Sequence, residues 1–209
     1  MSRFLLVCAA AALLGGCSQP SAPTEPAKVK IEHPPDVFRV KFQTSKGDFV
    51  LQVTKDWAPH GVDRFFDLVQ TDFFNGARFF RVTARIVQFG INGDPKISAL
   101  WRESRILDDP VKQSNTKGRI AFAALQDPNS RTVQVFINSV DNKMLDKSRF
   151  SPFGEVVSGM EVVSSIYSGY GDSPPRGNGP VQDMIQLQGN AYLEKSFPRL
   201  DYIKKASIE

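Results

Sequence analysis

The sequence has few of the residues that bind metals or form disulfides. Its 209 residues include two cysteines and two histidines, and both cysteines, Cys8 and Cys17, lie within the first seventeen residues. His33 and His60 belong to no His pair, HExxH motif or Cys/His cluster. We therefore expect neither a metal site nor a cofactor. Ser–His hydrolytic chemistry is also disfavoured, because nothing near His60 resembles a nucleophile elbow.

Long apolar runs and long runs of one charge are also missing. The apolar run at residues 4–14 is too short for a membrane-spanning helix, which needs about 20 apolar residues. The 26 Lys and Arg and the 22 Asp and Glu are mixed along the chain, which carries a net charge of +4. No basic run is long enough for a nucleic-acid groove, so we expect no nucleic-acid partner.

Residues 1–16 have the pattern of a signal peptide. Arg3 precedes the apolar run, which ends in Leu14-Gly15-Gly16-Cys17, a close match to the bacterial lipobox. In that motif small residues admit the peptidase, and the cysteine thiol receives the lipid. We expect lipidation at Cys17, no remaining free thiol, and a lipid-anchored protein of the bacterial cell envelope, on the outer membrane facing the periplasm or the cell surface. An ordinary signal peptide with a chance cysteine is the alternative.

Residues 17–36 are predicted to be the lipidated cysteine and a flexible spacer, since they are rich in Pro, Ser, Ala and Lys without apolar periodicity. A folded domain is predicted for residues 37–209, with a C-terminal extension from about residue 189. No internal repeat occurs, and the length favours one domain with appendages.

The pattern within this domain indicates a mainly β protein. Residues 37–54 predict a β-hairpin, and apolar residues at helical spacing after Pro59 predict a helix. Further strands are predicted at 77–82, 86–89, 119–124, 133–137, 153–157 and 181–187, and a second helix at 160–166. Irregular structure is predicted at 90–115 and 168–180. Together these elements predict a closed eight-stranded antiparallel barrel capped by two helices.

Two short motifs carry little functional signal by themselves. Asp108-Asp109-Pro110 pairs two carboxylates, but adjacent acidic residues before proline are typical of a solvated turn. Gly177-Asn178-Gly179 is a single GxG in a proline-rich segment, which favours a flexible loop over a phosphate-binding turn.

The most specific signal is a series of short motifs spread along the domain. In chain order they are Thr44-Ser45-Lys46-Gly47, Trp57-Ala58-Pro59, Phe79-Phe80-Arg81-Val82, Gln88-Phe89-Gly90, the segment Asp127-Pro128-Asn129-Ser130-Arg131-Thr132-Val133-Gln134-Val135-Phe136-Ile137-Asn138, Asp141-Asn142-Lys143-Met144-Leu145-Asp146 and Pro152-Phe153-Gly154-Glu155-Val156-Val157-Ser158-Gly159-Met160. In this order they resemble the cyclophilin family of peptidyl-prolyl isomerases, over residues 37–189. Residues 189–203 resemble a C-terminal extension found in some bacterial members.

The resemblance implies a catalytic arginine and a pocket for proline. Arg81 matches the family's catalytic arginine, whose planar set of N–H donors suits hydrogen bonding to a twisted prolyl amide. The other matching positions imply a peptide-binding site made of Phe136 as pocket floor, Ile86 and Leu145 as apolar walls, Gln88 and Gln134 as amide groups for the substrate backbone, Ala124 and Leu125 as the strand that faces the peptide, and Met144 and Phe150 as further binding residues.

Several positions depart from the family pattern. Between Arg81 and Gln88 the chain is one residue shorter, which puts Arg85 near a wall position that is usually Phe. Either Ile86 takes that place or the pocket has lost an aromatic side chain. Leu125 replaces the usual Asn, so one side chain that would bind the substrate backbone is missing. Met144 stands where Trp is common, and because its side chain lacks the indole N–H we expect weak cyclosporin binding. The family's frequent pocket histidine is absent, with Arg149 or Phe150 in its neighbourhood.

These residues favour a peptidyl-prolyl isomerase that assists the folding of extracytoplasmic proteins. Its partners would be unfolded or proline-containing polypeptides and the membrane that holds its lipid, and we expect a monomer. The alternative is a membrane-tethered proline-peptide-binding or chaperone module with little isomerase activity. A purely structural envelope protein is a third reading, which the retained polar set disfavours.

Overall fold

The computed structural model describes residues 33–209. The predicted signal peptide, Cys17 and most of the predicted spacer lie outside the described residues. Residues 33–36 belong to no helix or strand, and the Asp36 carbonyl accepts a hydrogen bond of 2.8 Å from the Lys55 N–H. Regular structure begins at Val37, as the sequence predicts. No helix within residues 33–209 is long and apolar enough to cross a membrane.

The domain opens with the predicted hairpin of β1 (Val37–Thr44) and β2 (Gly47–Thr54). Buried residues alternate along both strands, because successive side chains point to opposite faces of the sheet. Gly47 closes the turn with φ of 125°, a conformation that glycine adopts without strain. The sequence prediction of a hairpin is therefore confirmed.

Helix α1 (Pro59–Gln70) follows a 3-10 turn, η1 (Lys55–Trp57), and packs its apolar face into the core. Pro59 suits the first turn, because an N–H at this position has no hydrogen-bond partner within the helix and proline lacks one. The first free N–H groups, of His60 and Gly61, donate to the Asp109 carboxylate at 3.0 and 2.9 Å. Asp109 is only 4% exposed, so the prediction of a solvated turn is wrong for this residue.

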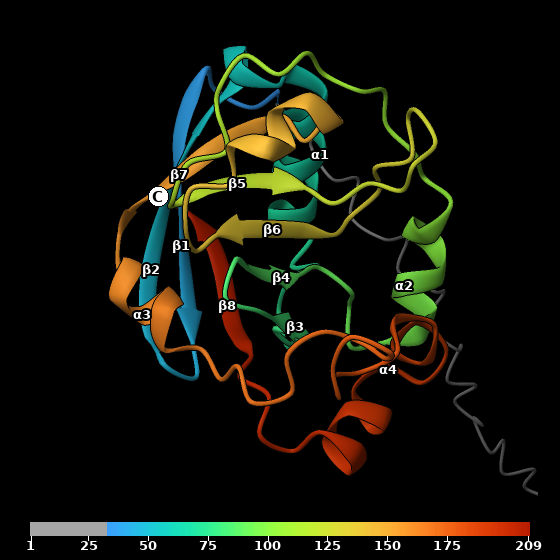
Figure 1. Cartoon of the computed structure of the whole chain (residues 1–209). Coiled ribbons are helices and arrows are strands. Elements are labelled where there is room, and N and C mark those ends of the chain that lie inside the picture. The colour runs from blue at the N-terminus through green and yellow to red at the C-terminus, as the bar shows by residue number, and fades with distance from the viewer. Residues whose placement is uncertain (1–32) are drawn as a thin grey trace, which may run out of the picture. The chain divides into compact units, whose positions relative to one another are not determined.

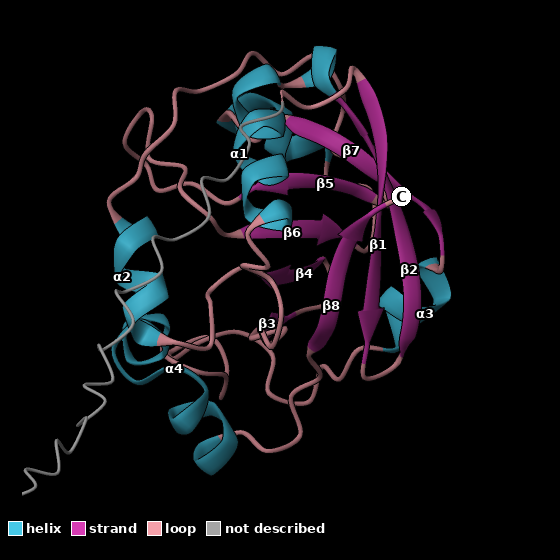
Figure 2. Ribbon diagram, turned by 180° about the vertical axis from the view of Figure 1, so that it is seen from behind, coloured by secondary structure: helices cyan, strands magenta, loops and turns pink. Residues whose placement is uncertain are grey.

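Eight antiparallel strands form one curled sheet, a half-barrel (Figures 1 and 2). The remaining strands are β3 (Arg81–Val82), β4 (Ile86–Phe89), β5 (Arg119–Phe122), β6 (Val135–Asn138), β7 (Pro152–Ser158) and β8 (Ile203–Ile208). Their order across the sheet is β3-β4-β6-β5-β7-β2-β1-β8. The edge strands are β3 and β8. Backbone hydrogen bonds link residues 76–79, before β3, to residues 201–203, at the start of β8, and the Phe79 N–H donates to the Asp201 carbonyl at 3.0 Å. Full closure and a two-helix cap remain predictions.

Phenylalanine fills the core between the sheet and α1. Phe42 stacks on Phe49 with ring centroids 4.9 Å apart, and Phe65 lies 4.8 Å from Phe153. These rings are fully buried. Aromatic pairs of this kind add to the free energy of burial, so this cluster holds the strands that carry the site in place.

Two further helices, one predicted and one not, lie in the middle of the chain. Helix α3 (Met160–Ser165) follows Gly159 as predicted, whereas α2 (Pro95–Arg102) lies in a stretch predicted to be irregular. The start signal for α2 is present in the sequence, since Asp94 accepts the Lys96 N–H at 2.8 Å and Pro95 begins the helix. A short 3-10 helix, η2 (Lys143–Ser148), precedes β7.

The C-terminal region differs most from the sequence prediction. The strand predicted at 181–187 is wrong, because helix α4 (Gln182–Ser196) occupies this segment, with a kink at Gly189. Its buried residues are Gly189 at the kink, Ile185 before it and Leu193 after it. The last strand is β8, which pairs with β1 at Phe42 and Ala206. Residues after 189 are therefore partly integral to the sheet, and residues 167–202, between α3 and β8, form an inserted segment (Figure 1).

Candidate active site

Arg81, Gln88 and Phe136 form a row across three neighbouring strands. Arg81 of β3 pairs with Gln88 of β4, which pairs with Phe136 of β6. Residues directly opposite in antiparallel strands point to the same face. On β4, Val87 and Phe89 point into the core, so Ile86 and Gln88 face the other side. The strand register thus places an arginine, an amide and an aromatic ring side by side.

A chain of hydrogen bonds fixes the Arg81 guanidinium. Arg81 Nη1 donates to Gln88 Oε1 at 3.0 Å, and Gln88 Nε2 donates to Gln134 Oε1 at 2.8 Å. On its other edge, Arg81 Nε and Nη2 donate to the two oxygens of Asp172 at 2.7 and 3.0 Å. Within residues 33–209, three of the five guanidinium N–H groups have an acceptor and two do not.

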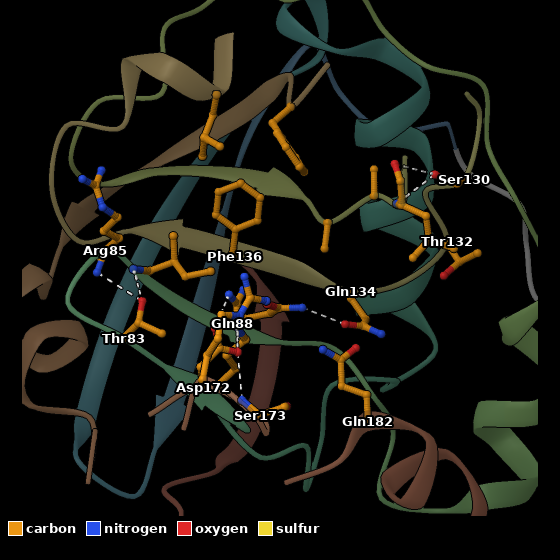
Figure 3. A pocket seen from close by; sticks show the side chains of 18 of the residues that line it. Thr83, Arg85, Gln88, Ser130, Thr132, Gln134, Phe136, Asp172, Ser173 and Gln182 are labelled. Atoms are coloured by element: carbon orange, nitrogen blue, oxygen red, sulfur yellow. Dashed lines mark hydrogen bonds and ion pairs between the residues drawn. The ribbon is translucent and has the colours of Figure 1, made fainter. Parts of the chain in front are cut away.

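Asp172 is the charged group in direct contact with Arg81, and it is itself well held. Its Oδ1 accepts the Ser173 N–H at 2.8 Å, and Arg176 Nε lies 3.3 Å from its Oδ2. Figure 3 shows Asp172 and Ser173 beside Gln88 at the edge of the groove. Hydrogen bonds donated by Arg81 hold the pKa of the Asp172 carboxyl below its usual range, although burial opposes this. The carboxylate is therefore ionised at neutral pH.

An apolar pocket lies over Phe136, in a groove of about 1120 Å³. Phe136 is 3% exposed, and its ring meets that of Phe150 edge to face at 5.6 Å between centroids. Ile86, Leu145 and Met144 line the same groove. Figure 3 shows Phe136, Gln88 and Gln134 facing this space. The groove therefore places an apolar surface over Phe136 next to the polar side chains of Arg81, Gln88 and Gln134.

Two neighbouring residues of the short segment after Arg81, Arg85 and Ile86, both line the groove. Ile86 lines the groove from β4, on the same face as Gln88. Arg85 turns toward η2, where its Nη1 donates to Asn142 Oδ1 at 3.0 Å and its carbonyl accepts Asn142 Nδ2 at 3.0 Å. Ile86 therefore lines the groove while the Arg85 side chain is bound to Asn142, and the role of Ile86 as an apolar wall stays a prediction.

The segment after β5 presents backbone groups to the groove. The Leu125 N–H donates to Ser130 Oγ at 2.9 Å, and Ser130 Oγ donates to the Asp127 carbonyl at 2.8 Å, which fixes this turn. Within residues 33–209, neither backbone polar group of Ala124 has a hydrogen-bond partner. A bound peptide in extended form would find a donor and an acceptor there. Leu125 is 69% exposed, so its side chain adds a loose apolar rim.

All the predicted site residues within the domain come together in this groove, whose lining includes Arg81, Ile86, Gln88, Ala124, Leu125, Gln134, Phe136, Met144, Leu145 and Phe150. Their individual roles stay predictions. Within the described part of the chain, no three His, Cys, Asp or Glu side chains gather closely enough to hold a metal ion.

Comparison with known proteins identifies the family. The model of the family described as "Cyclophilin type peptidyl-prolyl cis-trans isomerase/CLD" matches residues 39–187. The chain belongs to the cyclophilin family. It is 34% identical over 140 residues to peptidyl-prolyl cis-trans isomerase B of Escherichia coli strain K12, a match that covers 61% of this chain and 82% of that protein. Its enzyme class is therefore peptidyl-prolyl cis-trans isomerase.

Other cyclophilins match in sequence and in fold. Peptidyl-prolyl cis-trans isomerase cyp18 of Streptomyces antibioticus is 30% identical over 161 residues, covering 70% of this chain and 93% of that protein. A cyclophilin of Cryptosporidium parvum, solved in the presence of the dipeptide Ala-Pro, has a TM-score of 0.60 and 18% identity, covering 82% of this chain and 98% of that one. The structural likeness shows the shared fold.

One wall of the groove lies outside the motifs that carry the family resemblance. Asp172, Ser173 and Arg176 come from the loop after α3, Gln182 and Asp183 from the start of α4, and Arg102 from α2. None of these residues was predicted from the sequence, because no local pattern shows which strand a loop or a helix end packs against. Only the fold brings Asp172 to Arg81, across 91 positions of sequence.

Proposed function

We propose that this cyclophilin isomerises X–Pro bonds in the groove over Phe136, with Arg81 as the catalytic residue. The observation that carries this is the placement of Arg81, which is fixed by three hydrogen bonds, lines the groove and keeps two N–H groups unused. The expected substrates are unfolded or proline-containing polypeptides.

The chemistry requires stabilisation of a twisted amide. Resonance gives the X–Pro bond a rotation barrier of about 18–20 kcal/mol. At the transition state the prolyl nitrogen is out of conjugation and regains a lone pair, which accepts a hydrogen bond more strongly than in the planar amide. An N–H of Arg81 held against that nitrogen stabilises the transition state more than the ground state, and this difference lowers the barrier.

The rest of the groove holds the substrate while the bond rotates. The proline ring rests on Phe136 between Ile86 and Leu145, and the peptide backbone pairs with Ala124. Gln134 accepts a bond from Gln88 through its Oε1, so its Nε2 is left to donate to a substrate carbonyl. With the proline ring and the chain on one side of the X–Pro bond held in place, the chain on the other side can rotate.

Exchange NMR on a short Ala-Pro peptide tests the assignment, since it needs no coupling protease. We expect the full chain to raise the cis–trans exchange rate and Arg81→Ala to lower kcat/KM about 100-fold or more. Peptide binding without rate enhancement by the wild type would instead support the tethered binding or chaperone module. An Arg81→Ala variant with unchanged activity would refute the role of Arg81.

We also propose that the enzyme acts on extracytoplasmic proteins as a lipid-anchored monomer. Support comes from the sequence alone, in the apolar run at residues 4–14, the lipobox ending at Cys17 and the spacer that follows. The test is expression of the full chain in a bacterium with a radiolabelled fatty acid. We expect label in the wild type and none in Cys17→Ser, and equal labelling of both would contradict the proposal.

A further inference from the structure

The inserted segment between α3 and β8 makes two arginine–carboxylate pairs with the region around β3. Asp172 binds Arg81, and Glu194 Oε1 accepts a hydrogen bond of 2.9 Å from Arg78 Nη2. The pairs differ in setting, because Glu194 is 62% exposed in its side chain whereas Asp172 is only 15% exposed. Of the two, the Arg81–Asp172 pair lies in the groove.

The loop that carries Asp172 folds back so that its later residues contact the Asp172 backbone. The Asp172 carbonyl accepts the Gly179 N–H at 2.8 Å, and the Ser173 hydroxyl donates to the Pro180 carbonyl at 2.6 Å. A Cβ on Gly177 would collide with the backbone of Asp172, and one on Gly179 would lie 2.9 Å from the Asp172 carbonyl oxygen. The Gly177-Asn178-Gly179 motif lies in a loop, as predicted, and its two glycines let that loop close on Asp172.

The inserted segment is fastened to the strands that carry Arg81. Ile185, Leu193 and Leu200 form a second buried apolar cluster with Phe80, next to Arg81 in the chain, and with Ile91. The backbone N–H of Asn190 donates to the Gly93 carbonyl at 2.9 Å, and its side chain donates to the Gly76 carbonyl at 3.1 Å. A loop held in this way has a fixed position relative to Arg81.

We propose that Asp172 is a positioning residue that orients the Arg81 guanidinium for catalysis. This inference rests on the proposed function of Arg81. Asp172 binds the edge formed by Nε and Nη2, and Gln88 binds one N–H of Nη1, so the two unused N–H groups are set in direction. Without the carboxylate, a single hydrogen bond, donated by Arg81 to Gln88, would hold this long side chain with its several rotatable bonds. Because two donors stay unused, the pair leaves Arg81 able to reach a substrate.

The first test compares Asp172→Asn with Glu194→Gln in the full chain. Both variants remove one carboxylate of the inserted segment from an arginine, but only Asp172 lines the groove. We expect Asp172→Asn to lower kcat about tenfold or more with little change in KM, and Glu194→Gln to match the wild type. The Arg81 Nε–H signal in a ¹⁵N NMR spectrum should be protected from exchange in the wild type and in Glu194→Gln, and lost in Asp172→Asn.

A second variant moves the loop without removing the charge. Gly177→Ala should displace Asp172 and lower kcat in the same direction, with the Nε–H signal weakened. If the wild type is active and Asp172→Asn keeps or raises kcat, the positioning role is refuted, and a raised kcat would mean that Asp172 restrains Arg81 instead. If the wild type itself shows no rate enhancement, the proposed function fails, which is a separate outcome.

Discussion

Arg81 and Arg131 are both paired with carboxylates from distant loops, yet their surroundings differ. The side chain of Arg131 is fully buried, with Nη2 donating to Asp109 Oδ2 at 3.0 Å and also to the Leu107 carbonyl. The Arg81 side chain is 23% exposed at the edge of a groove and keeps two free N–H groups. Arg131 therefore links segments of the fold, whereas Arg81 is free to bind a ligand in the groove.

The carboxylates also differ in what else they hold. Asp109 accepts the His60 and Gly61 N–H groups, so one residue ties α1 to the segment around Arg131. Asp172 is held by its own loop, through the Ser173 N–H and the Gly179 contact to its carbonyl. Loss of the first pair should therefore affect stability, and loss of the second should affect rate.

The largest expected effect comes from breaking the buried pair. Arg131→Met leaves the Asp109 carboxylate, in a side chain that is 1% exposed, without its cation. Breaking a buried ion pair in this way costs about 3–5 kcal/mol of unfolding free energy. Urea denaturation of the full chain measures it. A loss below about 1 kcal/mol would show that the helix N–H groups alone satisfy Asp109.

A change at Arg81, which is partly exposed, should affect the rate more than the stability. A lysine at position 81 places one compact cation where a planar fork now contacts Asp172 and Gln88 together, so it cannot reproduce the geometry. We expect Arg81→Lys to lower kcat/KM about 100-fold, with a small change in the urea midpoint. A variant with near-normal activity would mean that charge alone suffices.

The pH dependence of catalysis should follow Asp172. Its pKa is lowered in the folded protein, so the pair with Arg81 is intact above the ordinary carboxyl value of about 4 and is lost as pH falls through the lowered pKa. Arg81 from β3 and Arg176 from the same loop contact it, while the groove also holds other charged groups, namely Arg85, Arg102, Glu103, Arg105 and Asp183. Exchange NMR should show constant kcat from pH 7 to about 4 and a fall below.

Asp172→Asn should lack that fall and run at a constant lower rate across the same range. Circular dichroism at each pH separates loss of rate from loss of fold. A wild type whose activity drops well above pH 4 while it stays folded would assign the titration to another group.

The smallest effect concerns the rim of the groove. Met144 is 66% exposed and its side chain has no N–H to donate, whereas an indole at this position would supply one. One added hydrogen bond is worth about 0.5–1.5 kcal/mol, so Met144→Trp should tighten cyclosporin binding by about two- to tenfold. Calorimetric titration measures both proteins, and tight binding by the wild type would contradict this account.

The sequence predicted the sheet side of the site better than the inserted side. Strand periodicity and family motifs located β1, β2 and α1, and brought Arg81, Gln88 and Phe136 into one groove. These features depend on local pattern and on motifs that have a fixed order.

The missed features depend on long-range contacts. The Arg81–Asp172 pair spans 91 positions, and no local pattern marks Asp172 as a partner. Helix α4 was read as a strand because its apolar residues are few and its buried face is short, with Gly189 in the middle. Asp109 looked like a turn residue because the helix that it caps lies 48 positions earlier.

A double-mutant cycle tests the central claim most directly. Exchange NMR gives kcat/KM for the wild type, Arg81→Ala, Asp172→Asn and the double variant in the full chain. If Asp172 acts by orienting Arg81, Asp172→Asn lowers the rate about tenfold or more in the wild type and leaves it unchanged once Arg81 is alanine. The same proportional loss in both backgrounds would contradict the account, since Asp172 would then act independently of Arg81.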